Sequence, residues 1–183
     1  MTAELCGIVL ANAEETHLTC EEILENLNGQ NIMERRKEEK VRIPVMEKSF
    51  TMLKPETVER NLIGEILKRI EDSGFRILAI KLIRATQQQA EKLYEPHVNK
   101  SFYNELVQHI TSGPILPLIV ESEDAINKLR TLIGATNPDK AEIGTIRKDF
   151  GISITKNVIH AADSKENFER ESKIFFSQDD IVR

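Results

Sequence analysis

The residues best able to do chemistry in this chain are one histidine and a set of cationic and hydrogen-bonding side chains near predicted turns. His160, in the segment NVIHAAD, could be a packed core histidine, a metal ligand or a nucleophile, and its apolar neighbours alone favour the first. The set comprises Lys54, Arg130, Thr136, Asn137, Arg147 and Asn157. Residues at strand ends and in connecting loops can converge from distant parts of a sequence, so this set could cradle a polyphosphate. Taken one at a time, each is better explained as a solvated surface group.

Other catalytic and metal-binding motifs are missing from the sequence. It has no GxxxxGK[ST] segment, which excludes a P-loop nucleotide site, and the DFG at 149–151 lacks the other protein-kinase segments. Cys6 and Cys20 show no CxxC spacing, and His17 adds one ligand only, so no zinc site is expected. The net charge of −5 disfavours a nucleic-acid surface, but it allows a small phosphorylated ligand.

Apolar periodicity and helix-stop residues predict alternating strands and helices from residue 47 onward. The predicted strands are 48–54, 75–85, 114–122 and 152–160. The predicted helices are 58–74, 86–95, 101–113, 122–134 and 163–176, with a polar loop and one helical turn over 135–151. Pro117 lacks a donor for the strand ladder, so we expect it at a sheet edge or near the beginning of its strand.

This order predicts an α+β fold. Without the small inserted helices it reads βαββαβ, the pattern of the ferredoxin-like sandwich. We therefore expect a four-stranded antiparallel sheet covered by helices on one face, with an extra helical hairpin and a long loop. The fold alone decides nothing about function.

Residues 1–45 are predicted to be an N-terminal extension, because all nine aromatic residues lie at or after Phe50. Within it, 16–29 has the capping box and stop of a short helix, and the charged segment 33–42 is typical of a solvated linker or a solvated helix. Residues 177–183 are expected to form a C-terminal tail. The short apolar segment GIVLANA has no basic residues before it, and no apolar run is long enough to cross a bilayer, so we expect a cytoplasmic protein.

Four segments, in order, carry a family resemblance: FTMLKPETVERNLIGEIL, LYEPHVNKSFYNELVQHITSGP, GATNPDKAEIGTIRKDFG and NVIHAADSKENFERE. They resemble the opening strand and Lys-Pro pair, the nucleotide-binding helical hairpin, the arginine turn and the Asn-x-x-His-Gly-Ser-Asp-Ser signature of the nucleoside diphosphate kinases. The similarity spans residues 46–176, which we therefore expect to be the catalytic domain.

The resemblance implies a ping-pong kinase in which His160 takes the γ-phosphoryl group of ATP and passes it to a nucleoside diphosphate. Glu171 would orient His160 through its other ring nitrogen, and Lys54 would help to neutralise the phosphates. These roles agree with general chemistry, because phosphoryl transfer depends mainly on in-line positioning and charge neutralisation. A carboxylate on one imidazole nitrogen fixes the tautomer that leaves the other nitrogen able to attack.

The resemblance also implies the ligands and the assembly. The nucleotide-binding residues would be Lys54, Tyr94, Phe102, Arg130, Thr136, Arg147 and Asn157. Phe102 would stack on the base of the nucleotide. Stacking does not distinguish the hydrogen-bonding edges of the bases, so it fits an enzyme that accepts several different bases. Mg²⁺ would be held mainly by the nucleotide phosphates, with no direct protein ligand, and the chain would form a homo-oligomer, either a tetramer or a hexamer.

The chain departs from the family pattern in four places. Ala161-Ala162 replace Gly-Ser, which removes a hydroxyl bond to the histidine–glutamate pair worth roughly 0.5–1.5 kcal/mol, so we expect a slower but active enzyme. Ile143 replaces a proline in the loop that usually contacts neighbouring subunits. Glu56-Thr57 replace Asp-Gly on what we expect to be an exposed turn, and the extension is additional.

Two other hypotheses remain open from the sequence. The chain could be a catalytically inactive relative that serves as a nucleotide-sensing or scaffold module, which only Ala161-Ala162 favour. It could also be an RNA-recognition module, but that needs exposed aromatics on the middle strands and a basic face, and the sequence predicts neither.

Overall fold

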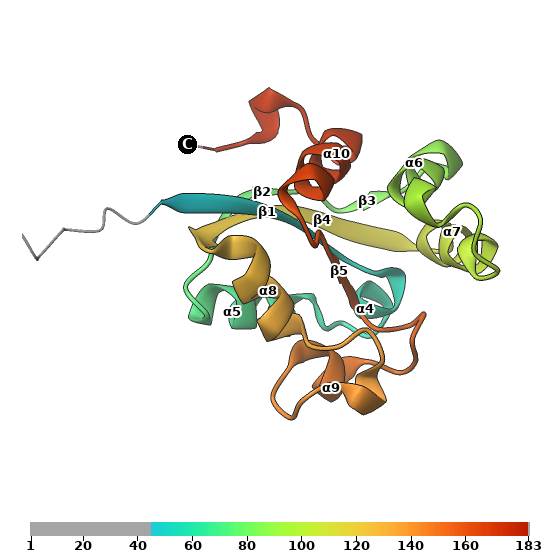
Figure 1. The fold of residues 1–183 in the computed structure, drawn as a ribbon, viewed down its shortest axis with the longest axis horizontal. Helices are drawn as coiled ribbons and strands as arrows, with labels where there is room; N and C mark the ends of the chain where they lie inside the picture. Colours follow the sequence, from blue (N-terminus) through green and yellow to red (C-terminus); the bar gives the residue numbers. More distant parts are fainter. Residues whose placement is uncertain (1–44, 183) are drawn as a thin grey trace, which may run out of the picture. The chain divides into compact units, whose positions relative to one another are not determined.

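An antiparallel sheet lies at the centre of the computed structural model, which describes residues 45–182 (Figure 1). Its strands are β1 (Met46–Leu53), β2 (Arg76–Ile80), β3 (Ile83–Arg84), β4 (Pro114–Glu123) and β5 (Ile159–Ala161). The order is β2-β4-β1-β5, with β3 paired to β4. This arrangement confirms the ferredoxin-like α+β fold, with the short β3 as an additional piece. The predicted helix 16–29 and linker 33–42 lie outside the described residues.

Helices cover both faces of the sheet, so the expectation of a single covered face is wrong. The α-helices are α4 (Pro55–Glu59), α5 (Ile63–Asp72), α6 (Gln87–Leu93), α7 (Tyr103–Thr111), α8 (Ala125–Ile133), α9 (Ile146–Phe150) and α10 (Lys165–Phe175). One core cluster joins the sheet to α6, α7 and α10, and a second joins it to α5, α8 and α9 (Figure 1). The continuous burial of Ser49–Leu53 in β1 and the apolar stretch of β4 agree with this, because strands covered on both faces do not alternate between buried and exposed residues.

The single helix predicted over 58–74 is interrupted. Pro55 occupies the first turn of α4, where its missing N–H costs nothing, so the helix begins three residues earlier than predicted. Asn61 then adopts a left-handed conformation (φ 57°), which asparagine tolerates better than most residues, and α5 begins at Ile63. The result is a short helix directly after the first strand.

Pro117 lies in the central strand β4, so its predicted edge position is wrong, although it is near the beginning of the strand, as expected. Its carbonyl accepts from Lys81 N at 3.1 Å, so its ring nitrogen faces the same neighbour. That neighbour is interrupted between Ile80 and Ile83, where β2 ends and β3 begins. The proline is tolerated because the missing donor falls at this interruption.

The last strand is much shorter than the predicted 152–160, since β5 contains only Ile159–Ala161. Residues 152–156 fold into a turn in which Ile152 N donates to Lys156 O at 2.8 Å, and Val158 has a positive φ of 64°. Both features are incompatible with an extended strand. The alternating apolar residues of the segment 152–158 therefore belong to a loop and not to a strand.

The residues after α10 return to the sheet. Gln178–Asp180 form a 3₁₀ turn, and Val182 N donates to Leu78 O at 2.8 Å. Lys81 and Asp180 form an ion pair at 2.7 Å. Within residues 45–182, no helix is both long and apolar enough to span a membrane.

Candidate active site

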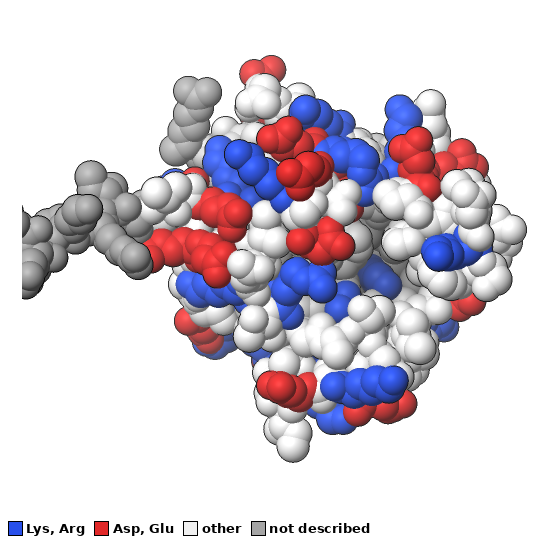
Figure 2. Space-filling model, viewed as in Figure 1, with Lys and Arg blue, Asp and Glu red and all other residues white. Residues whose placement is uncertain are grey.

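One cavity of about 620 Å³ brings together eight of the nine side chains that the family resemblance implied. They are Lys54, Tyr94, Phe102, Arg130, Thr136, Arg147, Asn157 and His160. The ninth, Glu171, is buried and contacts His160. Asn137, which was also in the candidate set, does not line this cavity, and its side chain accepts from Asp139 N at 3.0 Å. Figure 2 shows a hollow in this face of the molecule, with lysine or arginine atoms visible inside it. Segments separated by more than 100 residues therefore converge on one concave, cationic surface.

His160 lies on β5 and is held by Glu171 from α10. The distance between His160 Nε2 and Glu171 Oε2 is 2.7 Å, and the side chains are 22% and 4% exposed. A carboxylate beside Nε2 keeps the proton on that nitrogen, so Nδ1 carries the free lone pair. The Tyr94 ring stands edge-on to the imidazole, 6.3 Å between centroids. This arrangement can present a neutral, oriented nucleophile to the cavity.

The backbone before His160 is strained and is fixed by the segment after β1. Val158 is β-branched yet has φ 64°, a conformation that costs on the order of 1–3 kcal/mol. Its N–H donates to Glu56 Oε1 at 2.9 Å, and its carbonyl accepts from Thr57 Oγ1 at 2.6 Å. These three residues are buried. Such strain persists only where the surroundings over-determine it, as they do here.

The expectation that Glu56-Thr57 lie on an exposed turn is therefore wrong. Glu56 is 4% exposed and Thr57 is fully buried. The second oxygen of Glu56 contacts His109 Nε2 at 2.7 Å, and the hydrogen bonds from His109 and Val158 lower the pKa of Glu56 despite the opposing effect of burial. The position is a buried, fully hydrogen-bonded carboxylate that supports the nucleophile's strand.

Three cations line the cavity. Lys54 is buried, and its Nζ donates to Thr155 O at 2.9 Å. Burial lowers the pKa of Lys54 to about 8, although Glu56 partly offsets this. Burial also lowers the pKa of Arg147 to about 10, with a further contribution from Arg130. Buried cations without an anionic partner are costly, so both residues would gain from an anionic ligand.

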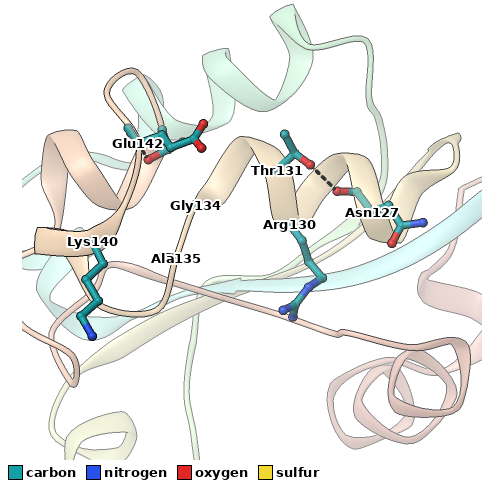
Figure 3. A pocket seen from close by; sticks show the side chains of 8 residues that line it. Asn127, Arg130, Thr131, Gly134, Ala135, Lys140 and Glu142 are labelled. Carbon is teal, nitrogen blue, oxygen red and sulfur yellow. Dashed lines mark hydrogen bonds between the residues drawn. The ribbon is translucent and has the colours of Figure 1, made fainter.

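Arg147 has a structural task as well. Its Nη1 donates to Gly134 O at 3.0 Å and its Nη2 to Ile159 O at 2.9 Å, while its buried Nε has no partner among the described residues. Arg130, on α8, is exposed and forms no hydrogen bond with a described side chain or backbone group through its guanidinium. It also lines a neighbouring cavity of about 500 Å³ beside Lys140 (Figure 3). Arg130 is therefore a cation that an anion can reach without breaking an existing bond.

Thr136 and Asn157 meet at the rim of the cavity. Asn157 Nδ2 donates to Thr136 O at 2.9 Å, and Asn157 Oδ1 is buried without a partner among the described residues. Thr136 is exposed in the loop after α8. The pair ties that loop to the strand of His160, and an unpaired buried acceptor at a cavity wall would be satisfied by a donor on a ligand.

The opposite wall carries the aromatic residues. Phe102, at the beginning of α7, is 45% exposed, which is unusual for a phenylalanine, and its ring lies 5.9 Å from that of His97. Tyr94 is buried, and burial raises the pKa of its hydroxyl, reinforced by Glu171 and Glu56. An exposed ring on one wall and cations on the other fit a ligand with a flat, apolar end and an anionic end.

The sequence did not identify several residues that line the same cavity. His97, Glu105, Ile154, Thr155 and Asp163 are among them. Thr155 Oγ1 donates to Glu105 Oε1 at 2.6 Å, which links the loop before β5 to α7. The strand predicted over 152–160 concealed this loop, because strand residues there would not reach α7.

The donor set fits a divalent cation that arrives with phosphates. The residues that the structure describes include no group of three or more His, Cys, Asp or Glu side chains placed to hold a metal ion. Mg²⁺ commonly binds through one or two carboxylates plus substrate phosphates. Of the two carboxylates at the cavity, Asp163 has a pKa lowered mainly by a hydrogen bond from Asn167.

Comparisons with known proteins agree with this geometry. Residues 47–181 match the family model described as nucleoside diphosphate kinase. A nucleoside diphosphate kinase of Thermosipho africanus is 57% identical over 137 residues, covering 75% of this chain and 93% of the relative. One from Methanocaldococcus jannaschii is 50% identical over 135 residues, covering 74% and 96%.

Solved structures give the same result. The nucleoside diphosphate kinase of Halobacterium salinarum in complex with CDP is 38% identical with a TM-score of 0.73, covering 76% of this chain and 93% of that one. The enzyme of Aquifex aeolicus is 37% identical with a TM-score of 0.73, covering 75% and 100%. The chain belongs to the nucleoside diphosphate kinase family and is a phosphotransferase that moves the terminal phosphoryl group of a nucleoside triphosphate to a nucleoside diphosphate.

Proposed function

We propose that the transfer proceeds in two steps through a phosphohistidine at His160. In the first step the lone pair of Nδ1 forms a bond to the γ-phosphorus of the triphosphate, mainly ATP. The bond from that phosphorus to the β–γ bridging oxygen breaks, and the diphosphate leaves with the electron pair. In the second step a terminal oxygen of another nucleoside diphosphate takes the phosphoryl group, and the P–N bond returns its electrons to the imidazole.

The observation that carries this proposal is the His160–Glu171 contact of 2.7 Å inside a cation-lined cavity. The carboxylate stabilises the Nε2–H tautomer and the positive charge that develops on the ring during attack. Lys54, Arg130 and Arg147 would neutralise the phosphate oxygens, which is the main demand of phosphoryl transfer. Asn157 and Thr136 would orient the nucleotide between these cations and the aromatic wall.

The nucleotide itself would lie with its base on Phe102 and its sugar near Tyr94 and Lys54. The solved relative that contains CDP supports binding of a nucleoside diphosphate. Mg²⁺ would be held by the phosphates and would add positive charge to the transferring group. Arg130, Thr136 and Arg147 would hold the same phosphates from the protein side.

The test is phosphoryl labelling. Incubation with γ-labelled ATP should give an acid-labile, alkali-stable phosphoprotein that passes its label to GDP. His160→Ala should abolish both reactions, whereas His97→Ala, the matched control at another histidine of the cavity, should retain the label. If His160→Ala still becomes labelled and still converts GDP to GTP, the proposed route is wrong.

The proposal extends to the assembly and the location. A homo-oligomer, either tetramer or hexamer, in the cytoplasm is what family membership favours, and the 92% exposure of Ile143 leaves an apolar side chain for a subunit contact. We also propose that 46–176 is the catalytic part, 1–45 an extension and 177–183 a tail. Native mass spectrometry and activity of the full chain and of a chain beginning at Met46 test the assembly and the role of the extension together.

A further inference from the structure

Glu171, the carboxylate that holds His160, has a second oxygen, Oε1, which is bound by a neighbouring arginine. Glu171 is 3% exposed, and its Oε1 accepts from Arg170 Nη2 at 2.9 Å. Among residues 45–182, Arg170 is the only side chain that donates to this oxygen within hydrogen-bond distance. A buried carboxylate with one oxygen unpaired would be free to rotate away from the imidazole and would cost desolvation energy.

Ala162, two residues after His160, has no side-chain donor that could bind Glu171 Oε1. Ala162 is 1% exposed, and its side chain is a methyl group packed in the core. Its backbone N–H is occupied by Phe50 O at 3.0 Å. The family signature that this segment resembles has a serine at this position, so this chain lacks a hydroxyl that could donate to the histidine–glutamate pair.

Arg170 is itself held on several sides, which makes it a rigid support. Its Nη1 donates to the carbonyls of Lys92 and Leu93 at 2.8 and 3.2 Å, at the end of α6. Its Nη2 also reaches Asn167 Oδ1 at 3.2 Å, one turn earlier on α10. A planar guanidinium with these contacts has one orientation, and that orientation aims Nη2 at Glu171.

We propose that Arg170 is a positioning residue that fixes Glu171, and through it the reactive tautomer of His160, in place of a hydroxyl at position 162. The proposal rests on the phosphohistidine route given above. It adds that the chain of contacts runs from the end of α6 through Arg170 and Glu171 to the nucleophile. It also explains how a site with Ala162 can retain an oriented histidine.

The test compares Arg170→Met with Lys173→Met, an exposed cation on the same helix whose removal changes the net charge equally. Single-turnover formation of the phosphohistidine should be about tenfold slower in Arg170→Met, since a hydrogen bond to a charged group is lost. ADP affinity should stay within about twofold, because Arg170 does not line the cavity. Lys173→Met should match the wild type in both measurements.

Two further readouts separate positioning from a general loss of structure. Ala162→Ser added to Arg170→Met should raise the rate at least about threefold above that of Arg170→Met, because under the proposal a hydroxyl at position 162 and Arg170 serve the same carboxylate, while the contact with α6 stays lost. The ¹⁵N signal of His160 Nε2 should shift toward a weaker hydrogen bond in Arg170→Met and move back in the double variant. Arg170→Lys is the reserve variant if Arg170→Met does not fold, and it should be slowed with unchanged ADP affinity.

The possible results are distinguishable. Phosphorylation of Arg170→Met within about twofold of the wild type, an equal loss in Lys173→Met, or no recovery with Ala162→Ser would each overturn the proposal while leaving the phosphohistidine route intact. If the wild-type chain acquires no acid-labile label at His160, the route itself fails, and that failure is seen before any Arg170 variant is measured.

Discussion

Replacing Glu56 by alanine tests whether a buried carboxylate fixes the strained backbone ahead of the nucleophile. Glu56 accepts from Val158 N at 2.9 Å and contacts His109 Nε2 at 2.7 Å. Its removal leaves a buried N–H on a residue with φ 64° and a histidine side chain that is only 10% exposed without a partner. The perturbation therefore removes two bonds at once from the segment that leads into His160.

The expected loss of stability is substantial. A buried donor left without an acceptor costs about 1–3 kcal/mol, and a lost bond between the carboxylate and His109 costs a similar amount, so the free energy of unfolding should fall by about 2–6 kcal/mol. For a unit of this size, each kcal/mol corresponds to roughly 2–5 °C, so the Tm should fall by at least about 4 °C. Phosphohistidine formation should fall as well, because Asn157 directly precedes Val158 and His160 follows it by two residues.

Urea unfolding at one fixed protein concentration is the measurement, since an oligomer's apparent stability depends on concentration. Glu59→Ala is the matched control, an exposed glutamate of the same short helix, and should change the free energy of unfolding by less than about 0.5 kcal/mol. Glu56→Gln should be intermediate, because it retains an acceptor for Val158 N but loses the charge facing His109. A loss below about 1 kcal/mol in Glu56→Ala, with phosphorylation unchanged, would refute the reasoning.

Two other predictions follow from the cavity walls. Because burial lowers the pKa of Lys54 to about 8, the free enzyme loses this cation as the pH rises through that value, and kcat/KM for ATP should fall above about pH 8. Lys54→Arg stays charged, so its kcat/KM should not fall in this pH range even if its rate is lower. An identical pH profile in the two proteins would contradict the assignment. Gly134→Ala should destabilise the chain by more than about 1 kcal/mol, because φ is 85° and a Cβ would lie 2.5 Å from Thr145 Oγ1. Gly64→Ala in α5, where nothing lies within 4 Å of the added Cβ, should be neutral or stabilising in thermal unfolding. Equal effects of the two substitutions would contradict this explanation.

The order of strands and the gathering of the site were predictable because they follow from local patterns. Apolar periodicity located the strands that became β1, β2 and β4, and the βαββαβ order then fixed which strand ends share one edge. Lys54, Arg147 and His160 lie where those ends and loops meet, so their convergence in one cavity follows from topology. The family resemblance added Glu171 and the aromatic wall, which no periodicity indicates.

The errors lie where tertiary contacts overrode local patterns. A glutamate after a Lys-Pro pair has the pattern of an exposed turn, and its burial depends on His109 and Val158, which are 53 and 102 residues away. The segment 152–158 alternates like a strand, but a left-handed valine is stable there only because of bonds from the segment after β1. No role was predicted for Arg170, whose contacts depend on the carbonyls at the end of α6, 77 and 78 residues away.

These long-range bonds explain how a three-residue edge strand can hold a nucleophile. β5 pairs only with β1, so its ladder is short, yet the carbonyls of residues 158–160 are all occupied. The carbonyl at 158 accepts from Thr57 Oγ1 and Lys54 N, that at 159 from Arg147 Nη2, and that at 160 from Thr51 Oγ1. Arg147 thus belongs both to the cavity wall and to the scaffold of the strand, whereas Lys54 holds the strand through its main-chain N–H, which a substitution leaves in place. A change at Arg147 should therefore move the nucleophile as well as the charge, so its effect on activity cannot be divided into binding and chemistry by a single substitution.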